Sequence, residues 1–166
     1  MFKDEKSWEI SMTNILLAYS ILVPDIGYLQ GMNYLSSLLY LAVQDELKTF
    51  TMLANLMDVS TIIRKYYNVD HAIITKYTNQ LCKLIEETLP QLHEKIEEEG
   101  IIIESILFEW IISMFSNIFP LDLSLKLWDE ILFHGEFYII KIGLTIFGII
   151  NERIRKDSNV DVMDML

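Results

Sequence analysis

Apolar side chains recur at steps of three and four residues along most of this chain, and that spacing constrains its fold more than any other feature. The first series comprises Trp8, Met12, Ile15, Tyr19 and Leu22. Such a series lies on one face of an α-helix. No stretch alternates apolar with polar residues, and no hairpin signal separates two apolar runs. The sequence therefore predicts an all-α fold with well over half of its residues in helices and no sheet.

Prolines and glycines mark where the helices begin and end. Pro24 and Gly27 should end the first helix near Val23, while Pro90 and Gly100 should frame a later one. We expect further helices that carry the apolar series 32–42, 47–57, 73–85, 106–115 and 120–132, and a last helix over about 137–155, with a short helix and a loop within 58–69. The run 94–99 should form a solvated face, and the final eleven residues should fray. The expected architecture is a single orthogonal bundle of eight or nine helices.

Composition limits the kinds of partner that the chain can bind. Its 166 residues are 52% hydrophobic and 22% charged, which indicates one globular domain. A formal charge of −11 argues against nucleic acid and anionic lipid, since both require a basic surface. The single cysteine, Cys82, excludes an intrachain disulfide and suits a reducing compartment. The most apolar run, 137–150, is too short to span a membrane and contains Lys141, so we expect no direct membrane insertion.

A glutamine beside a glycine, Gln30-Gly31, lies between a turn and a long apolar helix. A glutamine amide can accept a hydrogen bond from an attacking water and donate one to a phosphate oxygen, as in GTP hydrolysis. Gly31 would allow another backbone or a ligand to come close. The alternative is a buried helix start at which Gln30 caps a neighbouring backbone group. Spacing alone favours this second interpretation.

Several common kinds of enzyme site are not indicated. The three histidines, His71, His93 and His134, are too far apart in sequence for a helical metal-binding motif, so no metal site is expected. There is no P-loop and no dinucleotide-binding glycine pattern. No sequence neighbourhood supports an activated nucleophile. The remaining possibility is a side chain that acts in the active site of another protein.

The segment Tyr28–Asn33, with Leu16–Tyr19 before it, resembles the glutamine motif of TBC domains, the GTPase-activating domains for Rab-type small GTPases. Further matches follow in the order of that family: Pro90–His93, Trp110–Phe115, and Leu127–Glu130 with Gly135 beyond it. The resemblance covers essentially the whole chain. It implies that residues 1–166 are a partial TBC domain, truncated at the N-terminus and also at the C-terminus. Residues Ile142, Ile146 and Ile149 should then form an exposed apolar patch.

The resemblance implies a role for each residue around the motif. Gln30 is the catalytic residue, which orients water and should be exposed beside a groove, and the partner-binding residues are Tyr28, Gly31 and Asn33. Tyr28 and Asn33 could instead only hold the loop. The partner is a Rab-family GTPase in its GTP state, which brings the GTP and Mg²⁺, so this chain needs no cofactor. A cytoplasmic location, peripheral to endomembranes through that partner, and a role in vesicle trafficking and intracellular protein transport follow from the same resemblance.

Two tryptophans and an aspartate have expected structural roles. Trp110 should lie in the core. Trp128 should pack while Asp129 accepts hydrogen bonds from backbone donors at a bend.

The family also uses an arginine, from an Ile-x-x-Asp-x-x-Arg motif that this sequence lacks. Its only arginines are Arg64, Arg153 and Arg155, all downstream of Gln30. An arginine finger contributes a factor of about 10³ to 10⁵ in rate. We therefore expect half of an active site here, and this chain alone should be inactive as a GTPase activator. The alternative is a non-catalytic small-GTPase-binding or scaffold module with the same fold.

Overall fold

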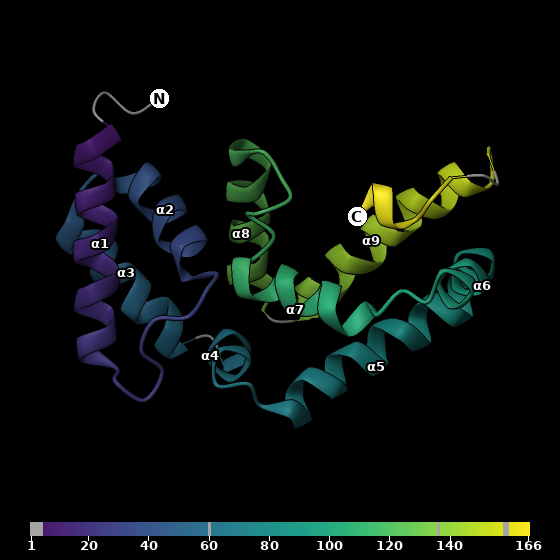
Figure 1. The fold of residues 1–166 in the computed structure, drawn as a ribbon, viewed down its shortest axis with the longest axis horizontal. Coiled ribbons are helices and arrows are strands. Elements are labelled where there is room, and N and C mark those ends of the chain that lie inside the picture. The colour runs from purple at the N-terminus through teal and green to yellow at the C-terminus, as the bar shows by residue number, and fades with distance from the viewer. Residues whose placement is uncertain (1–4, 60, 136, 158–159) are drawn as a thin grey trace. The chain divides into compact units, whose positions relative to one another are not determined.

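The computed structural model describes residues 5–59, 61–135, 137–157 and 160–166 (Figure 1). Within these ranges it contains helices only and no β-strand, which confirms the predicted fold class. The helices are α1 (Glu5–Leu22), α2 (Met32–Val43), α3 (Glu46–Val59), α4 (Thr61–Tyr67), α5 (His71–Thr88), α6 (Pro90–Glu99), α7 (Ile103–Ser113), α8 (Leu121–His134), α9 (Phe137–Ile154) and the 3₁₀-helix η1 (Met163–Met165).

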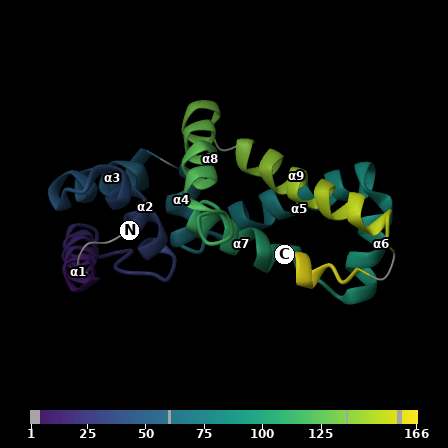
Figure 2. The same ribbon diagram turned by 90° about the horizontal axis from the view of Figure 1, so that it is seen from above.

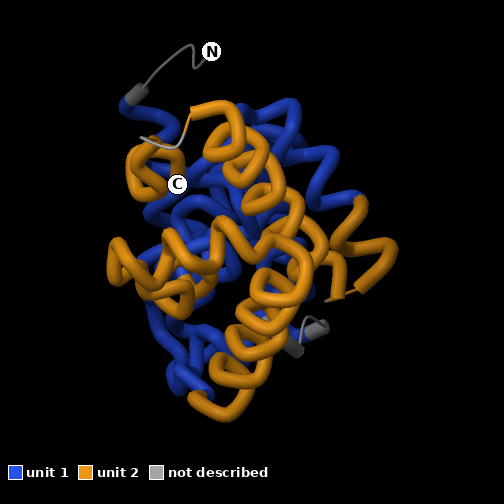
Figure 3. Tube along the Cα trace, turned by 90° about the vertical axis from the view of Figure 1, so that its right-hand side faces the viewer, with its two compact units in different colours: residues 1–70, 109–129 blue, residues 71–108, 130–166 orange. Residues whose placement is uncertain are grey.

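The chain divides into two compact units (Figure 3). Unit 1 comprises residues up to Asp70 together with Glu109–Asp129, and unit 2 comprises His71–Phe108 together with Glu130–Leu166. Each unit is therefore assembled from two separate stretches of sequence. The last turn of α7 and the first part of α8 belong to unit 1.

Unit 1 is built on α1, α2 and α3, which pack against one another (Figures 1 and 2). Helix α1 buries the predicted stripe through Ile15 and Tyr19, although Leu22 at its end is exposed. The carboxylate of Glu46, at the start of α3, accepts hydrogen bonds from Ser11 Oγ at 2.8 Å and Asn14 Nδ2 at 3.1 Å. These bonds connect the polar edge of α1 to the first turn of α3.

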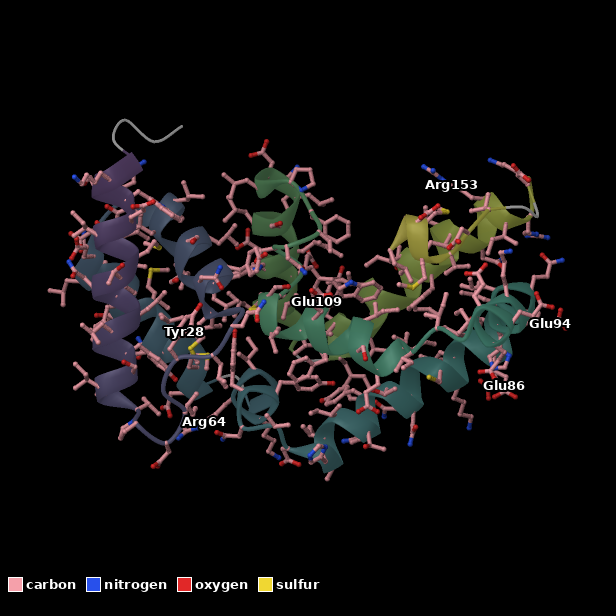
Figure 4. The ribbon with its side chains drawn as sticks, viewed as in Figure 1. Tyr28, Arg64, Glu86, Glu94, Glu109 and Arg153 are labelled. Atoms are coloured by element: carbon pink, nitrogen blue, oxygen red, sulfur yellow. The ribbon has the colours of Figure 1, made fainter. Side chains whose placement is uncertain are left out.

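Unit 2 contains α5, α6 and α9, which also pack together. Pro90 lies in the first turn of α6, and Gly100 ends that helix in the left-handed conformation with φ 64°, as the sequence predicts. Glu86 and Glu94 lie near the junction of α5 and α6 (Figure 4). Glu94, Glu97 and Glu98 are exposed, so most of the charged run forms the expected solvated face.

The C-terminal residues 160–166 do not fray, contrary to the prediction. Val162 is fully buried, and its backbone N–H donates to the Glu99 carboxylate at 3.1 Å. The Asp161 carboxylate accepts from the backbone N–H of Met163 at 2.8 Å, at the start of η1. The Val162 side chain and the Glu99 carboxylate thus attach this acidic segment to the rest of unit 2, while Asp161 orders the segment itself. Residues 158–159, also part of that prediction, lie outside the described residues.

The predicted apolar patch on α9 is only partly present. Ile142 is buried, contrary to the prediction, while Ile146 is half-buried and Ile149 is 57% exposed. Larger apolar exposure occurs instead where α8 ends and α9 begins, at Phe133 and Phe137. The side of α9 that carries Ile142 is turned inward within unit 2. None of the described helices is long and apolar enough to cross a membrane.

We expect Val162→Ala to lower the free energy of unfolding by about 1–3 kcal/mol, because it removes buried methyl groups and leaves a cavity. Urea unfolding followed by circular dichroism measures the change. Met163→Ala, at an exposed neighbour, is the matched control and should stay within about 0.5 kcal/mol of the wild type. Equal midpoints for the Val162 variant and the wild type would show that the segment is not anchored.

Candidate functional site

The Gln30 loop joins α1 to α2 in unit 1. The chain turns sharply after α1, where the Gly27 N–H donates to the Val23 carbonyl at 2.9 Å. Gln30 itself is exposed, whereas Met32, two residues later, is fully buried at the start of α2. The N-cap residue of α2 is Gly31, which has no side chain to cap the helix. Gln30 is thus accessible, as predicted, and the buried-cap interpretation does not describe it.

The residues on either side of Gln30 differ in how they are held. The Asn33 side-chain oxygen accepts a hydrogen bond from the Gly31 N–H at 3.2 Å, so Asn33 stabilises the loop. Asn33 is also exposed. Tyr28 is 53% exposed (Figure 4). Both side chains are accessible to a partner, and Asn33 in addition holds the turn.

Gly31 is buried and tightly enclosed. Its φ is 107°, a conformation that residues with a side chain rarely adopt. A Cβ atom placed there would lie 3.1 Å from the Ile112 side chain and 3.2 Å from the Tyr67 hydroxyl. The backbone beside Gln30 therefore rests directly on two side chains from other elements.

Helix α7, which carries Ile112, ends in an unusual conformation just beneath this loop. Met114 and Phe115 have positive φ values of 46° and 62°. The Met114 N–H donates to the Ile111 carbonyl at 3.1 Å and the Phe115 N–H to the Trp110 carbonyl at 2.8 Å. This is the Schellman arrangement of a helix C-terminus. Positive φ at two consecutive non-glycine residues is a source of backbone strain.

Two side chains satisfy carbonyls at this helix end. The Tyr67 hydroxyl donates to the Ile112 carbonyl at 2.6 Å, and Trp128 Nε1 donates to the Met114 carbonyl at 3.0 Å. A helix C-terminus leaves such carbonyls without partners within the helix. Both bonds lie inside unit 1 and connect α4 and α8 to the end of α7.

Burial raises the pKa of the Tyr67 hydroxyl far above its ordinary value near 10, and the nearby Tyr28 and Tyr19 hydroxyls raise it further. The hydroxyl therefore keeps its proton throughout the physiological range and remains a donor to Ile112. The sequence analysis missed Tyr67. Its only signal there is a pair of tyrosines at the end of a short segment with no clear pattern.

The other predicted residues have mixed outcomes. Trp110 and Trp128 are buried, as expected. Asp129 is exposed within α8 and not at a bend, so its predicted role as a backbone acceptor at a bend is wrong. The Schellman turn, and not Asp129, makes the bend in this region.

None of the arginine contacts described for this structure involves Gln30. Arg64, labelled in Figure 4, pairs with Asp58 at 2.9 Å within unit 1, and both side chains are exposed. Arg153 and Arg155 belong to unit 2, where Arg155 pairs with Glu152 at 3.2 Å. Across the described residues, no three His, Cys, Asp or Glu side chains gather as they would around a metal ion.

A pocket of about 190 Å³ opens in unit 1 between α2 and the segment that joins α7 to α8. Its lining residues are Tyr34, Ser37, Leu38, Leu41, Ser116, Phe119, Leu121 and Ser124. Gln30 does not line it. This pocket begins four residues after Gln30, at Tyr34, and it does not supply the groove that was expected beside Gln30.

A family model described as the Rab-GTPase-TBC domain matches residues 1–155. The chain belongs to this family.

Individual relatives agree with the family assignment. Drainin of Dictyostelium discoideum is 31% identical over 135 residues, which cover 81% of this chain and 30% of that protein. Human TBC1 domain family member 14 is 27% identical over 166 residues, covering 100% of this chain and 24% of that protein. TBC1 domain family member 12 of Xenopus tropicalis is 32% identical over 133 residues, covering 80% and 19%. The chain thus spans less than a third of each of these proteins.

We expect Gly31→Ala to lower the free energy of unfolding by about 1–3 kcal/mol, because its methyl group meets Ile112 and Tyr67 in a strained conformation. Gly27→Ala is the matched control. It also has a positive φ, but no atom lies within 4 Å of its added Cβ. Chemical denaturation of both variants should show the larger loss at position 31, and an equal loss would mean that crowding contributes nothing.

Tyr67 should make stability depend on pH in alkaline solution. Below about pH 10 the hydroxyl is protonated in both states, and its contribution is fully present. Above that pH the unfolded chain releases this proton while the native protein retains it, so unfolding becomes easier by up to about 1.4 kcal/mol per pH unit. Tyr67→Phe should remove this part of the slope between about pH 10 and 11.5, as measured by urea unfolding. If the free energy of unfolding fell with pH at the same slope in the wild type and in Tyr67→Phe, the raised pKa of Tyr67 would be contradicted.

Proposed function

We propose that this chain is the glutamine-bearing part of a GTPase-activating domain that acts on a Rab-family GTPase in its GTP state. The observation that carries the proposal is the exposed Gln30 beside a buried, tightly enclosed glycine, in a member of the Rab-GTPase-TBC family. Gln30 enters the nucleotide site of the partner, while the exposed Tyr28 and Asn33 contact that partner around it. Gly31 was expected to bind the partner as well, but it is buried, so its part is to hold the loop. GTP and Mg²⁺ belong to the GTPase.

Gln30 would act by positioning and not by acid–base chemistry. Its side-chain oxygen accepts a hydrogen bond from the attacking water, and its amide N–H donates to a phosphate oxygen. The amide is neutral and needs no adjustment of a pKa. A water held in line with the γ-phosphate reacts faster because its orientation is already fixed before the reaction.

The proposed reaction also needs a cation, which Gln30 cannot supply. Charge develops on the phosphate oxygens during transfer, and an arginine finger stabilises it by about 4–7 kcal/mol of barrier. Arg64 is paired with Asp58. The arginines of unit 2 lie at the end of α9, whereas the arginine motif of the family precedes the first helix in sequence. The chain alone should therefore be a very weak activator.

The same lack of an arginine motif favours a second candidate function, a non-catalytic module that binds a small GTPase or serves as a scaffold. In this case the exposed surface around Gln30 holds the GTPase without accelerating hydrolysis. The charge of −11 and the absence of a spanning helix among the described residues fit a protein that reaches endomembranes through its partner. We propose a cytoplasmic location and a role in vesicle trafficking for either function.

Single-turnover GTP hydrolysis on a panel of Rab GTPases tests the proposal. Three proteins are compared: this chain, this chain extended at its N-terminus by a segment that carries Ile-x-x-Asp-x-x-Arg, and the extended form with Gln30→Ala. We expect stimulation only by the second, with a gain of about 10³-fold or more over the first.

Each alternative outcome has a distinct meaning. Binding of a GTP-bound Rab without any stimulation by the extended form would favour the scaffold function. Equal activity of the short and extended forms would show that one of the existing arginines or the GTPase supplies the charge. Full activity of the Gln30→Ala form would remove the proposed role of Gln30.

A further inference from the structure

We propose that Tyr67 is the positioning residue for Gln30, acting through Ile112 and Gly31. The inference rests on the proposed function, since it concerns the aim of the glutamine that this function requires. A buried tyrosine in α4 would then contribute to the hydrolysis of GTP that is bound to another protein. Three contacts within unit 1 connect the two residues.

The first contact is the hydrogen bond from the Tyr67 hydroxyl to the Ile112 carbonyl, at 2.6 Å. In the Schellman turn around Ile112, the Trp110 carbonyl accepts from the Phe115 N–H and the Ile111 carbonyl accepts from the Met114 N–H. The Ile112 carbonyl makes neither of these two bonds, and it accepts a hydrogen bond from the Tyr67 hydroxyl instead. This bond fixes where the last turn of α7 lies relative to α4.

The second contact is between that last turn and the glycine. Both Ile112 Cδ1 and Cγ1 lie 3.1 Å from the position of a Cβ on Gly31, and the Tyr67 hydroxyl lies 3.2 Å from it. The hydroxyl therefore lies close to the loop and also bonds the backbone carbonyl of Ile112, the residue whose side chain supports the loop. A shift of Ile112 or loss of the hydroxyl leaves a gap beneath the Gly31 backbone.

The third link is covalent, because Gln30 shares a peptide bond with Gly31. Rotation of that peptide swings the glutamine side chain, whose amide is several bonds away from the loop backbone. Asn33 holds the other side of the same turn through the Gly31 N–H. A misplacement of about 1 Å in a positioning group can cost on the order of 10²-fold in rate. A modest loosening at Gly31 is therefore enough to lower the rate of hydrolysis.

Tyr66 provides a natural comparison, because it neighbours Tyr67 in α4 and is also fully buried. Its hydroxyl is not among the three atoms nearest the Gly31 Cβ position, whereas the Tyr67 hydroxyl is. Tyr66→Phe and Tyr67→Phe each remove one buried hydroxyl and keep the ring. Only the second removes a contact with the glutamine loop.

The kinetic test uses the arginine-extended form described above, with a Rab that it stimulates. We expect Tyr67→Phe to lower kcat for stimulated hydrolysis about 3- to 30-fold, with KM for the GTPase changed less than about threefold. Tyr66→Phe should keep kcat within about twofold of the unsubstituted form. In a Gln30→Ala background, which should already lack stimulation, Tyr67→Phe should leave hydrolysis at the same basal rate, because the residue that it positions is absent.

A second measurement needs no GTPase. Nitrogen-15 relaxation and amide exchange of Gln30 and Gly31, recorded on the chain itself, should show faster motion in Tyr67→Phe and no change in Tyr66→Phe. If Tyr67→Phe fails to fold, Ile112→Val takes its place, since it removes the Cδ1 atom that faces Gly31 and keeps the carbonyl. The same direction of change is expected for it.

The proposal is overturned if Tyr67→Phe retains the order of the loop or if it retains kcat. It is also overturned if Tyr66→Phe reproduces its effects. Failure of the proposed function looks different: the unsubstituted extended form then stimulates no Rab, whatever the loop measurements show. In that case a loosened loop in Tyr67→Phe would identify a structural support with no part in hydrolysis.

Discussion

The Gln30 loop depends on the absence of a side chain at Gly31. The backbone there passes over Ile112 and the Tyr67 hydroxyl at a distance that no Cβ could occupy without a shift. Its φ of 107° is available to glycine and strained for other residues. The loop can therefore leave α1, present an exposed glutamine and enter the buried start of α2 within a few residues. The Gln-Gly pair combines an accessible amide with a backbone that cannot relax inward.

The end of α7 is the other half of this arrangement. Two segments that resemble TBC motifs, Trp110–Phe115 and Leu127–Glu130, meet through the bond from Trp128 to the Met114 carbonyl. Their shared role in unit 1 is to complete a strained helix C-terminus, with Tyr67 completing it from another direction. Motifs that are separate in sequence thus contribute to one local structure. This accounts for motif tryptophans that are buried and therefore have no part in the proposed contact with a GTPase.

Local sequence signals predicted most helix boundaries, because Pro24, Gly27, Pro90 and Gly100 act on their immediate neighbours. The exposure of Gln30 was also predicted, from its resemblance to a glutamine that reaches a partner. The support beneath it could not be predicted. Tyr67 and the Ile112 carbonyl are 45 residues apart. Which buried hydroxyl meets which unpaired carbonyl is decided by tertiary packing.

The errors have a similar cause. Val162 is a single apolar residue in an acidic segment and has no periodic partners, yet unit 2 buries it. Helix α9 is apolar nearly all round, so its sequence could not show whether Ile142 or Ile149 faces inward. Asp129 follows a motif tryptophan but continues the helix. In each case the missing information is the position of another element.

The interleaved sequence of the two units affects the order in which the chain can fold as it is synthesised. Tyr67 and Gly31 leave the ribosome well before Ile112 and Trp128, because all of 71–108 lies between the two stretches of unit 1. At synthesis rates of about 5–20 residues per second, the delay between Tyr67 and Trp128 is about 3–12 s. For most of that interval the turn at Gly31 lacks Ile112, one of the two side chains that it rests on, and α1 to α4 carry an uncovered apolar surface. A nascent chain of this kind is most exposed to chaperones and misfolding just before its glutamine loop can take its final form.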